Sequence, residues 1–497
     1  MFSSFIFIFQ FQKGSDSMFT FCLALGSLLL GYFIYSRIFD KIFQPTDAPT
    51  PAITKNDGVD FVPLPTWKVF LIQLLNIAGL GPIFGALGGA LWGPSVYLWI
   101  VLGTIFAGGV HDYLSGMISL REGGKNISEI VGSQMGKTVL SIMRVFIVVL
   151  VALVGVVFTA GPAMLLTKLT SIPVTIWLVT ILIYYFLATL LPIDKLIARL
   201  YPIFGACLIF MALGIMFGML FGIGGHVMPE MTLSNLYPAE EQLPIWPLMF
   251  ITVACGAVSG FHSTQSPMMA RCLKSEKLAR PVFYGAMVSE GIIALIWATA
   301  GITFFNSTGG LMAAMQSGGP GGAVYDICIG FLGAGIGAAI AMVGVVVCPI
   351  TSGDTAFRVA RLTLAEWFDI PQKDVKHRVM LALPLLVLGG ILTQVDFNVI
   401  WRYFSWVNQT LATIILWTGA VYLHNFKPES YAYLVSLIPA AFMSVVTTSY
   451  ILYAPEGLQL SMEISTAGGF LFAIACLAMF WKFSRHSKSE SVEILHA

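Results

Sequence analysis

The sequence predicts an all-α, polytopic membrane protein, and three observations lead to this fold class. Of the 497 residues, 57% are hydrophobic and only 10% are charged, whereas soluble domains carry about 25% charged residues. The mean hydropathy is +0.85. Apolar runs close to the ~20 residues that a membrane-spanning helix needs recur along the whole chain. The remaining polar sequence is too short for a separate soluble domain.

These runs predict about thirteen transmembrane helices in a single domain over residues 18–483. The expected spans lie near residues 19–39, 68–91, 95–118, 138–160, 173–192, 201–222, 245–267, 283–305, 325–349, 378–395, 398–423, 431–453 and 464–483. We expect residues 1–17 to be an N-terminal tail or the product of an upstream start-site assignment. Residues 484–497 are expected to form a cytoplasmic tail.

Lys and Arg alternate between the connecting loops, and this alternation predicts the topology. The loops after the odd-numbered spans contain Lys and Arg, whereas those at 223–244, 306–324 and 454–463 contain none. Cytoplasmic loops carry the excess of Lys and Arg in membrane proteins. We therefore expect the N-terminus outside and the C-terminus inside.

The second span contains the stretch IAGLGPIFG (77–85), which predicts a broken helix. Pro82 lacks a backbone N–H and clashes with the carbonyl four residues back, and Gly79, Gly81 and Gly85 add backbone freedom. Unpaired backbone groups at such a break hold substrates and ions in transporters. The alternative is a kinked, tightly packed helix, because Gly and Pro are more frequent in membrane helices than in soluble ones.

The seventh span is the second candidate for a broken helix, because Gly256, Gly260 and Pro267 interrupt it. Its second half is more polar than a structural helix at membrane depth requires, with Ser259, His262, Ser263, Thr264, Gln265 and Ser266. We expect substrate-binding residues at this break and at the first one. The alternative is that the Ser and Thr hydroxyls bond back to their own helix.

The two breaks lie five spans apart, on spans of opposite direction. This relation predicts a five-plus-five inverted repeat of the leucine-transporter type, with the two breaks facing each other near mid-membrane. The repeats would cover 68–222 and 245–423, with peripheral helices at 19–39, 431–453 and 464–483. The halves show no sequence identity, so the prediction depends on topology and on the breaks alone.

The ninth span ends in CPITSGDTAFRVARL, and we expect Pro349 and Gly353 to break it near its inner end. Oxygen ligands that suit Na⁺, or a carboxylate that suits a proton, are supplied by Thr351, Ser352, Asp354 and Thr355. These residues are predicted to couple transport to an ion.

The leucine-transporter arrangement predicts where a sodium ion would bind. It would lie between carbonyls near Gly79 and the hydroxyls of Ser352 and Thr355, or Asp354 would exchange a proton in its place. The alternative is that Asp354 caps a helix and pairs with Arg358, four residues on.

His111 and Asp112 are further candidates for ion coupling, at the end of the third span. Ionisable residues inside a membrane are functional candidates by default, and imidazole titrates in the physiological range. His262 would serve as a second proton carrier, and Glu290 is another ionisable group within a span. As neighbours on a helix, His111 and Asp112 are expected to point in different directions. A buried, hydrogen-bonded structural histidine is the alternative.

No cofactor is expected. The seven cysteines form no CxxC pair and are interpreted as packing residues. The chain contains no zinc, haem or nucleotide motif, and the Gly-rich patch at 318–322 lacks the Gly-Lys-Ser/Thr ending of a P-loop. The formal net charge of +1 and the absence of a nucleic-acid signature indicate small-molecule substrates, ions and lipid as partners.

Five long stretches of the chain match one family. They are IAGLGPIFG (77–85), LWIVLGTIFAGGVHDYLSGMISLREGGKNISEIVG (98–132), ACGAVSGFHSTQSPMMARCLKSE (254–276), PITSGDTAFRVARL (349–362) and IWRYFSWVNQTLAT (400–413). They resemble the carbon starvation protein A family of bacterial transporters, over residues 18–483. The resemblance departs at Gln73, because longer members carry a paired His ahead of the IAG motif. The chain looks like the shorter form.

The resemblance implies a multi-pass importer of the bacterial cytoplasmic membrane, within the wider amino acid–polyamine–organocation superfamily. The family is linked to starvation responses and to uptake of peptides, and some members move pyruvate with protons. We therefore expect a secondary active transporter, not an enzyme, that imports small carbon sources with H⁺ or Na⁺. A substrate carboxylate would bind at a helix N-terminus exposed by a break. A channel-like facilitator or a membrane nutrient sensor is the alternative.

Overall fold

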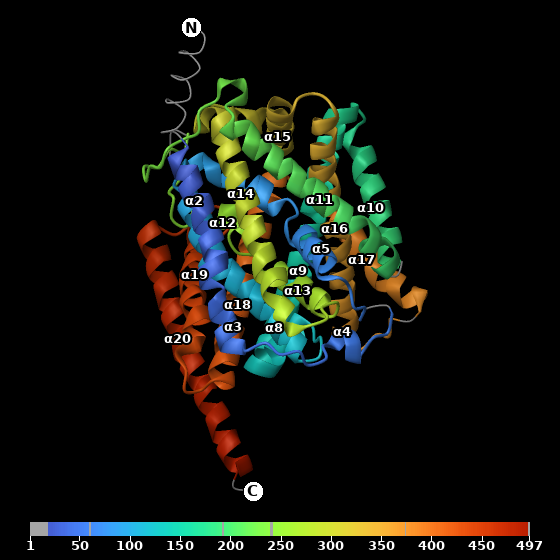
Figure 1. The fold of residues 1–497 in the computed structure, drawn as a ribbon, viewed down its shortest axis with the longest axis vertical. Helices are drawn as coiled ribbons and strands as arrows, with labels where there is room; N and C mark the ends of the chain where they lie inside the picture. The colour runs from blue at the N-terminus through green and yellow to red at the C-terminus, as the bar shows by residue number, and fades with distance from the viewer. Residues whose placement is uncertain (1–17, 59–60, 191–192, 239–241, 373, 496–497) are drawn as a thin grey trace.

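The computed structural model describes residues 18–495 except 59–60, 191–192, 239–241 and 373, and every regular element among these residues is a helix. The predicted N-terminal tail lies outside the described residues. In Figure 1 the first described helix, α2 (Phe19–Leu30), begins at the upper end of the bundle, and the last, α20 (Met462–Leu495), ends at the lower end. The two ends of the described chain thus lie on opposite faces.

Two sets of helices make up the bundle, one before and one after the long connection at 223–247. The first set comprises α2, α3 (Arg37–Phe43), α4 (Pro51–Thr54), α5 (Thr66–Ile77), α6 (Ala86–Gly89), α7 (Val96–Gly103), α8 (Gly109–Arg121), α9 (Ile127–Thr170), α10 (Val174–Leu190) and α11 (Ile193–Leu220). The second set comprises α12 (Leu248–Val253), α13 (His262–Ala270), α14 (Gly285–Phe304), α15 (Thr308–Leu332), α16 (Ile336–Trp367), α17 (Val375–Leu392), α18 (Phe397–Phe426), α19 (Leu434–Tyr453) and α20. Short π-helical turns extend several of these helices, including α2, α8 and α14.

The structure supports a multi-pass membrane protein. Nine described helices are long and apolar enough to cross a membrane, and the bent pair Thr66–Ile77 and Gly81–Trp92 makes ten. The apolar segment Val174–Ala188 is shorter, and neither α12–α13 nor α18 is among the ten. The predicted number of about thirteen spans is therefore not confirmed.

The helices divide into a buried centre and a lipid-facing periphery. In the spans Val96–Arg121 and Glu276–Phe304, 83% of the most apolar stretch is buried, whereas the figure is 22% in Val375–Leu392 and Met462–Lys482. The exposed side chains of α20 include Phe470 and Leu471, and an apolar surface of this kind is stable only against lipid or a partner. α19 and α20 pack on each other at one side of the bundle (Figure 1).

The predicted ninth span is wrong in its boundaries. Residues 308–332, expected to be partly a loop, form α15, and the chain turns at 333–335 before α16 begins. Gly333 allows this turn because it adopts φ +78°. The spanning helix is thus α16, which runs through Pro349 and Gly353 without the predicted break. A proline removes only one backbone hydrogen bond, and the packing of a long buried helix offsets that loss.

The two predicted broken spans run antiparallel and side by side. At one end of the pair, the backbone N–H of Leu64 donates to the carbonyl of Cys272 at 3.1 Å. At the other end, Nε1 of Trp92 donates to the carbonyl of Leu243 at 2.9 Å. The two interrupted helices therefore cross the middle of the bundle in opposite directions.

Candidate functional site

The second span breaks at residues 78–80, where its Gly and Pro residues predict a break. α5 ends there, and a π-helical turn at Gly81–Gly85 starts the second half, bent by 55°. The glycines also allow close packing. A Cβ on Gly79 would lie 2.4 Å from the ring of Phe158, and one on Gly81 would lie 2.2 Å from Cβ of Cys255. This stretch therefore contains both the predicted break and the tight packing of the alternative interpretation.

The seventh span breaks at residues 257–261, between a 3-10 turn at Ala254–Gly256 and α13. Pro267, predicted to interrupt this span, instead lies inside α13. Asn408 of α18 accepts hydrogen bonds from two backbone N–H groups of the break. The N–H of Phe261 donates to Oδ1 of Asn408 at 2.8 Å, and the N–H of Gly260 donates to its carbonyl at 3.0 Å.

The two breaks face each other, as predicted. A Cβ on Gly85 would lie 2.5 Å from the carbonyl oxygen of Val253, and Cα of Pro82 lies against Gly256. A side-chain bond also joins the two spans, from Nε2 of Gln73 to Oγ of Ser266 at 3.1 Å. The candidate substrate-binding residues of both breaks are thus brought together at the centre of the bundle.

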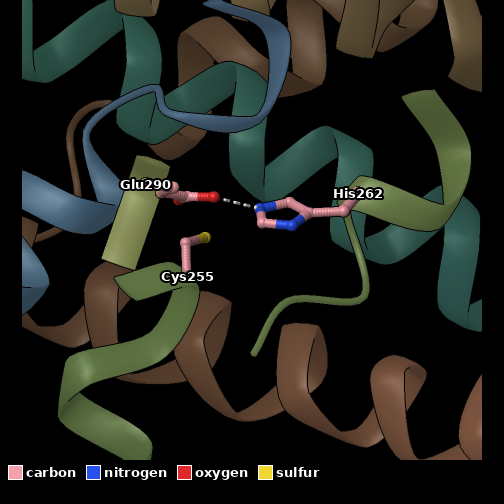
Figure 2. Close-up of side chains that lie close together, drawn as sticks. All are labelled: Cys255, His262 and Glu290. Atoms are coloured by element: carbon pink, nitrogen blue, oxygen red, sulfur yellow. Dashed lines mark ion pairs between the residues drawn. The ribbon is translucent and has the colours of Figure 1, made fainter. Parts of the chain in front are cut away.

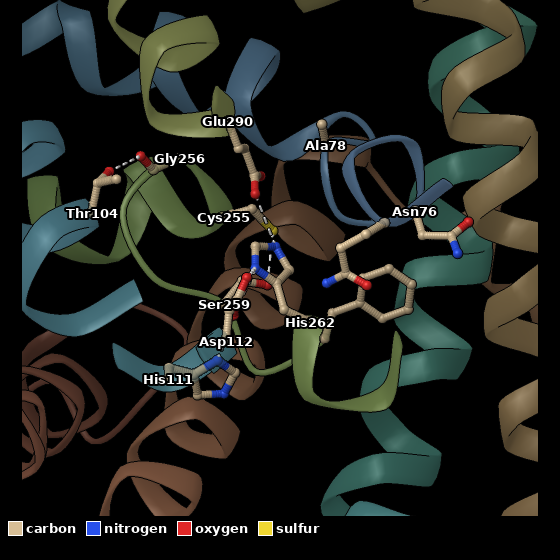
Figure 3. Close-up of polar contacts among 12 residues, drawn as sticks. Asn76, Ala78, Thr104, His111, Asp112, Cys255, Gly256, Ser259, His262 and Glu290 are labelled. Atoms are coloured by element: carbon tan, nitrogen blue, oxygen red, sulfur yellow. Dashed lines mark hydrogen bonds and ion pairs between the residues drawn. The ribbon is translucent and has the colours of Figure 1, made fainter. Parts of the chain in front are cut away.

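A buried cluster of four ionisable side chains lies beside the breaks (Figure 3). Asp112 of α8 is at its centre. Oδ1 of Asp112 lies 2.8 Å from Nδ1 of His111, and its Oδ2 lies 2.9 Å from Nδ1 of His262. On the other side of His262, Nε2 lies 3.3 Å from Oε2 of Glu290 on α14. The expectation that neighbouring His111 and Asp112 point apart is wrong, because the imidazole turns back onto the carboxylate.

The arrangement of donors and acceptors shows where the cluster can hold a proton. An ionised carboxylate only accepts hydrogen bonds, so Nδ1 of His262 donates to an ionised Asp112. That assignment leaves Nε2 of His262 facing the carboxylate of Glu290 at 3.3 Å. Neither of these two facing atoms has a hydrogen-bond partner within the described residues. A proton placed between them would satisfy both atoms and would belong to the pair as a whole.

Cys255 completes a group of three potential metal-ligand atoms in the described chain. The sulfur of Cys255, a nitrogen of His262 and an oxygen of Glu290 lie within 4.8 Å of one another (Figure 2). Structural zinc sites use four ligands. Here the sulfur already lies 3.2 Å from Oγ of Ser259 and accepts a hydrogen bond from Asn408. We therefore interpret the group as part of a hydrogen-bonded network and assign no metal to it.

The polar residues of the seventh-span break and of α13 divide between the two alternatives considered for them. Ser263 and Thr264 bond back to the carbonyls of Gly260 and Phe261, at 2.6 and 2.7 Å. Their hydroxyls thus follow the structural alternative. Ser259, His262 and Ser266, in contrast, reach side chains of other helices.

The ion-coupling candidates of α16 lie in the middle of that helix and not near its inner end. Oγ of Ser352 donates to the carbonyls of Leu75 and Asn76, at 3.2 and 3.3 Å, just before the first break. The predicted approach of this helix to the first break is thus observed, one turn before Gly79. Thr351 and Thr355 bond within α16, to the carbonyls of Cys348 and Ser352.

Asp354 lies inside the continuous helix α16 and does not cap it. Its Oδ1 is 3.8 Å from Nη2 of Arg358, so the expected pair with Arg358 forms, and both side chains are buried. The same nitrogen of Arg358 donates to the carbonyl of Ala188 at 2.7 Å.

Sequence reasoning missed Asn408, which joins the seventh-span break to α18. The signal was present, since Asn408 and Gln409 are adjacent amides in the middle of a predicted span. It also missed Asn76, whose buried amide has no hydrogen-bond partner within the described structure. Oε1 of Gln73 is likewise buried and unpaired there. Buried polar atoms of this kind need a structural or functional explanation, and these two lie at the first break.

Comparison with solved structures identifies the fold. A manganese transporter from Eremococcus coleocola aligns over 87% of this chain and 99% of its own, with a TM-score of 0.54 and 10% identity. At that identity the likeness concerns the fold alone, which is a helical membrane-transporter fold.

The chain belongs to the carbon starvation protein CstA family, whose model matches residues 16–161, 163–319 and 306–450. An uncharacterized membrane protein of Haemophilus influenzae is 40% identical, over 60% of this chain and 94% of its own. The peptide transporter CstA of Bacillus subtilis is 26% identical, over 86% and 88%. The pyruvate/proton symporter BtsT of Escherichia coli is 27% identical, over 54% and 46%. The last two of these relatives are named as transporters, in agreement with a transport function.

Proposed function

We propose that the protein is a secondary active importer of small carbon sources, peptides or pyruvate-like carboxylates, and that protons drive it. The names of the relatives support both substrate classes, and the family name supports a link to carbon starvation. The observation that supports the proton assignment is the buried His262–Glu290 pair, whose facing nitrogen and oxygen lie 3.3 Å apart with no hydrogen-bond partner among the described residues, so that a proton between them would satisfy both.

The coupling mechanism follows from where this pair lies. His262 is the first residue of α13, directly after the seventh-span break, so a movement of the break moves the imidazole. Asp112 holds the opposite ring nitrogen from α8. When His262 moves away from Glu290, the shared proton must leave with one partner or escape to water. Proton binding and the conformation of the broken helix are thereby coupled.

The substrate would bind between the two breaks after they separate, because they are packed in contact in this conformation. The unpaired amide of Asn76 and Oε1 of Gln73 are polar groups available beside the first break. This arrangement suits the five-plus-five inverted repeat, in which two broken helices enclose a central site. Na⁺ between Ser352 and the carbonyls near Gly79 is the alternative coupling ion.

The two ends of the bundle differ in a way that suits alternating access. At the end rich in Lys and Arg, ion pairs tie the loops together: Arg121 with Glu276 at 3.1 Å, and Arg280 with Asp40 at 2.8 Å. The opposite end holds a wide cavity, described below. By the positive-inside rule, the tied end faces the cytoplasm and the conformation is closed to the inside.

Uptake into proteoliposomes tests this proposal. The purified protein is reconstituted, and labelled pyruvate or labelled dipeptides are offered under an imposed H⁺ or Na⁺ gradient. We expect concentrative uptake with an inward H⁺ gradient at constant Na⁺. Uptake that only equilibrates would indicate the channel-like facilitator, and no uptake of any probe would favour the sensor. Accumulation that requires Na⁺ at constant pH would replace the proton with Na⁺.

A further inference from the structure

A cavity of about 640 Å³ lies over the outer halves of the two broken spans. This volume is within the range of about 300–1,000 Å³ typical of small-molecule sites. Its lining comes from both broken spans, α15, α18, α19 and the loop residues Tyr237, Leu243, Pro455, Gln459 and Leu460. The cavity is thus at the end whose loops lack Lys and Arg.

Arg402 is the single charged residue among those lining the cavity. Its Nε donates to Oε2 of Glu456 at 3.2 Å, and Glu456, with 4% of its side chain exposed, also contacts the hydroxyl of Tyr450. Glu456 therefore holds one side of the guanidinium in place. The two Nη atoms have no hydrogen-bond partner within the described residues, and 43% of the Arg402 side chain is exposed. A guanidinium fixed in this way can bind a carboxylate in a bidentate manner.

The rest of the lining is mainly aromatic and aliphatic. Trp92 and Tyr237 pack together with ring centroids 4.8 Å apart, and Tyr450 and Tyr453 add further rings. Rigid aromatic side chains of this kind favour a ligand with an apolar body. A guanidinium that Glu456 holds on one side only, together with apolar walls, matches a carboxylate that carries an apolar group.

The floor of the cavity separates it from the proton-holding cluster. The ring centroids of Phe84 and Trp401 are 6.0 Å apart, and those of Trp401 and Phe404 are 5.4 Å apart. Below them Phe158 continues the aromatic layer, 6.4 Å from Phe404 and 6.2 Å from Phe261, the residue before His262. A ligand in the cavity would therefore reach the central site only after these rings move apart.

Sequence reasoning expected a substrate carboxylate at a helix N-terminus exposed by one of the breaks. Just before α13, Asn408 already accepts the N–H groups of Gly260 and Phe261 through its own oxygens. Arg402, in contrast, is partly exposed and faces the cavity.

We propose that the cavity is an entry subsite in which Arg402 binds the carboxylate of a substrate with an apolar body, before the aromatic floor opens. Glu456 is a positioning residue that orients Arg402. This inference rests on the proposed transport function, which it extends by a second site on the route to the cluster. It also predicts a specificity, because the apolar walls favour a carboxylate with an apolar body over a short acid.

Equilibrium binding to the full-length protein in nanodiscs, without any gradient, tests the subsite. The probes are labelled alanyl-phenylalanine, the same dipeptide with a C-terminal amide, and pyruvate. We expect the free acid to bind about 10- to 100-fold more tightly than the amide, and more tightly than pyruvate. Arg402→Gln should lose this preference for the acid, and Arg402→Lys should retain part of it. Arg144→Gln is the matched control, because Arg144 pairs with Glu366 at 3.4 Å away from the cavity.

Equal binding of the acid and the amide by the wild type would overturn the proposal, as would unchanged acid binding by Arg402→Gln or no binding by the wild type. A thermal-unfolding midpoint like that of the wild type shows that Arg402→Gln is folded. The Asp112→Asn variant separates the two proposals, since it should keep the acid preference while losing proton-driven accumulation. If the wild type binds the acid through Arg402 but never accumulates substrate, the transport function fails and the subsite stands.

Discussion

The contact between the two breaks can be tested by adding a single methyl group. In Gly81→Ala the new Cβ would lie 2.2 Å from Cβ and 2.6 Å from Sγ of Cys255. Non-bonded carbon atoms settle at about 3.5–4.0 Å, so one broken helix must move by more than about 1 Å. Cβ of Cys255 is attached to the backbone and cannot swing away, which leaves the helix itself to shift.

Overpacking of this kind costs about 1–3 kcal/mol. For a chain longer than 250 residues this corresponds to a decrease of a few degrees in the thermal-unfolding midpoint. Measured in nanodiscs, Gly81→Ala should show this decrease together with a loss of uptake. Gly81→Leu should lower the unfolding midpoint further, because the leucine side chain would overlap Cys255 instead of filling an open cavity.

A double-mutant cycle shows whether Cys255 is the cause. Adding Cys255→Gly removes the clashing atoms, so the double variant should recover most of the lost stability, a coupling that only residues in contact show. Gly26→Ala is the control, since its Cβ would meet no atom within 4 Å. If Gly81→Ala is as stable as the wild type, or if Cys255→Gly gives no recovery, the two breaks are not packed as described.

Three further predictions follow from the same geometry. Asn408→Ala leaves the backbone N–H of Phe261 in the seventh-span break unpaired, at about 1–3 kcal/mol, and should lower the unfolding midpoint, while the exposed Gln394→Ala should not. An impermeant thiol reagent should label a cysteine at Ser234 but not one at Lys277 in intact cells, and the reverse result would invert the topology. Ser352→Ala should retain proton-driven accumulation, and its loss together with a requirement for Na⁺ would assign coupling to the sodium site.

The breaks were predictable because their causes are local. Gly79, Gly81 and Pro82 weaken a helix wherever it is placed, and Gly256 and Gly260 do the same. The antiparallel course of the two spans also followed from counting apolar runs. The break predicted at Pro349 failed because tertiary packing can hold a proline inside a long helix, as it does in α16.

The cluster was only partly predictable, because its members come from separate helices. Sequence reasoning selected His111, Asp112 and His262 one by one, as ionisable groups at membrane depth. No spacing along the chain could reveal that Asp112 binds His262, 150 positions away. The role of Asn408 could not be predicted for the same reason, because its oxygens accept hydrogen bonds from the backbone of another span. Buried polar residues can be recognised in a sequence, but their partners require the fold.

Proton-driven accumulation by the Asp112→Asn and Glu290→Gln variants tests the central claim most directly. Proteoliposomes loaded with unlabelled substrate first measure exchange across the membrane, which needs no net proton movement, and an imposed pH gradient then measures accumulation. We predict that both variants exchange substrate but no longer accumulate it, and that the exposed Glu463→Gln behaves as the wild type. Normal accumulation by Asp112→Asn and Glu290→Gln would show that the buried cluster does not carry the coupling proton.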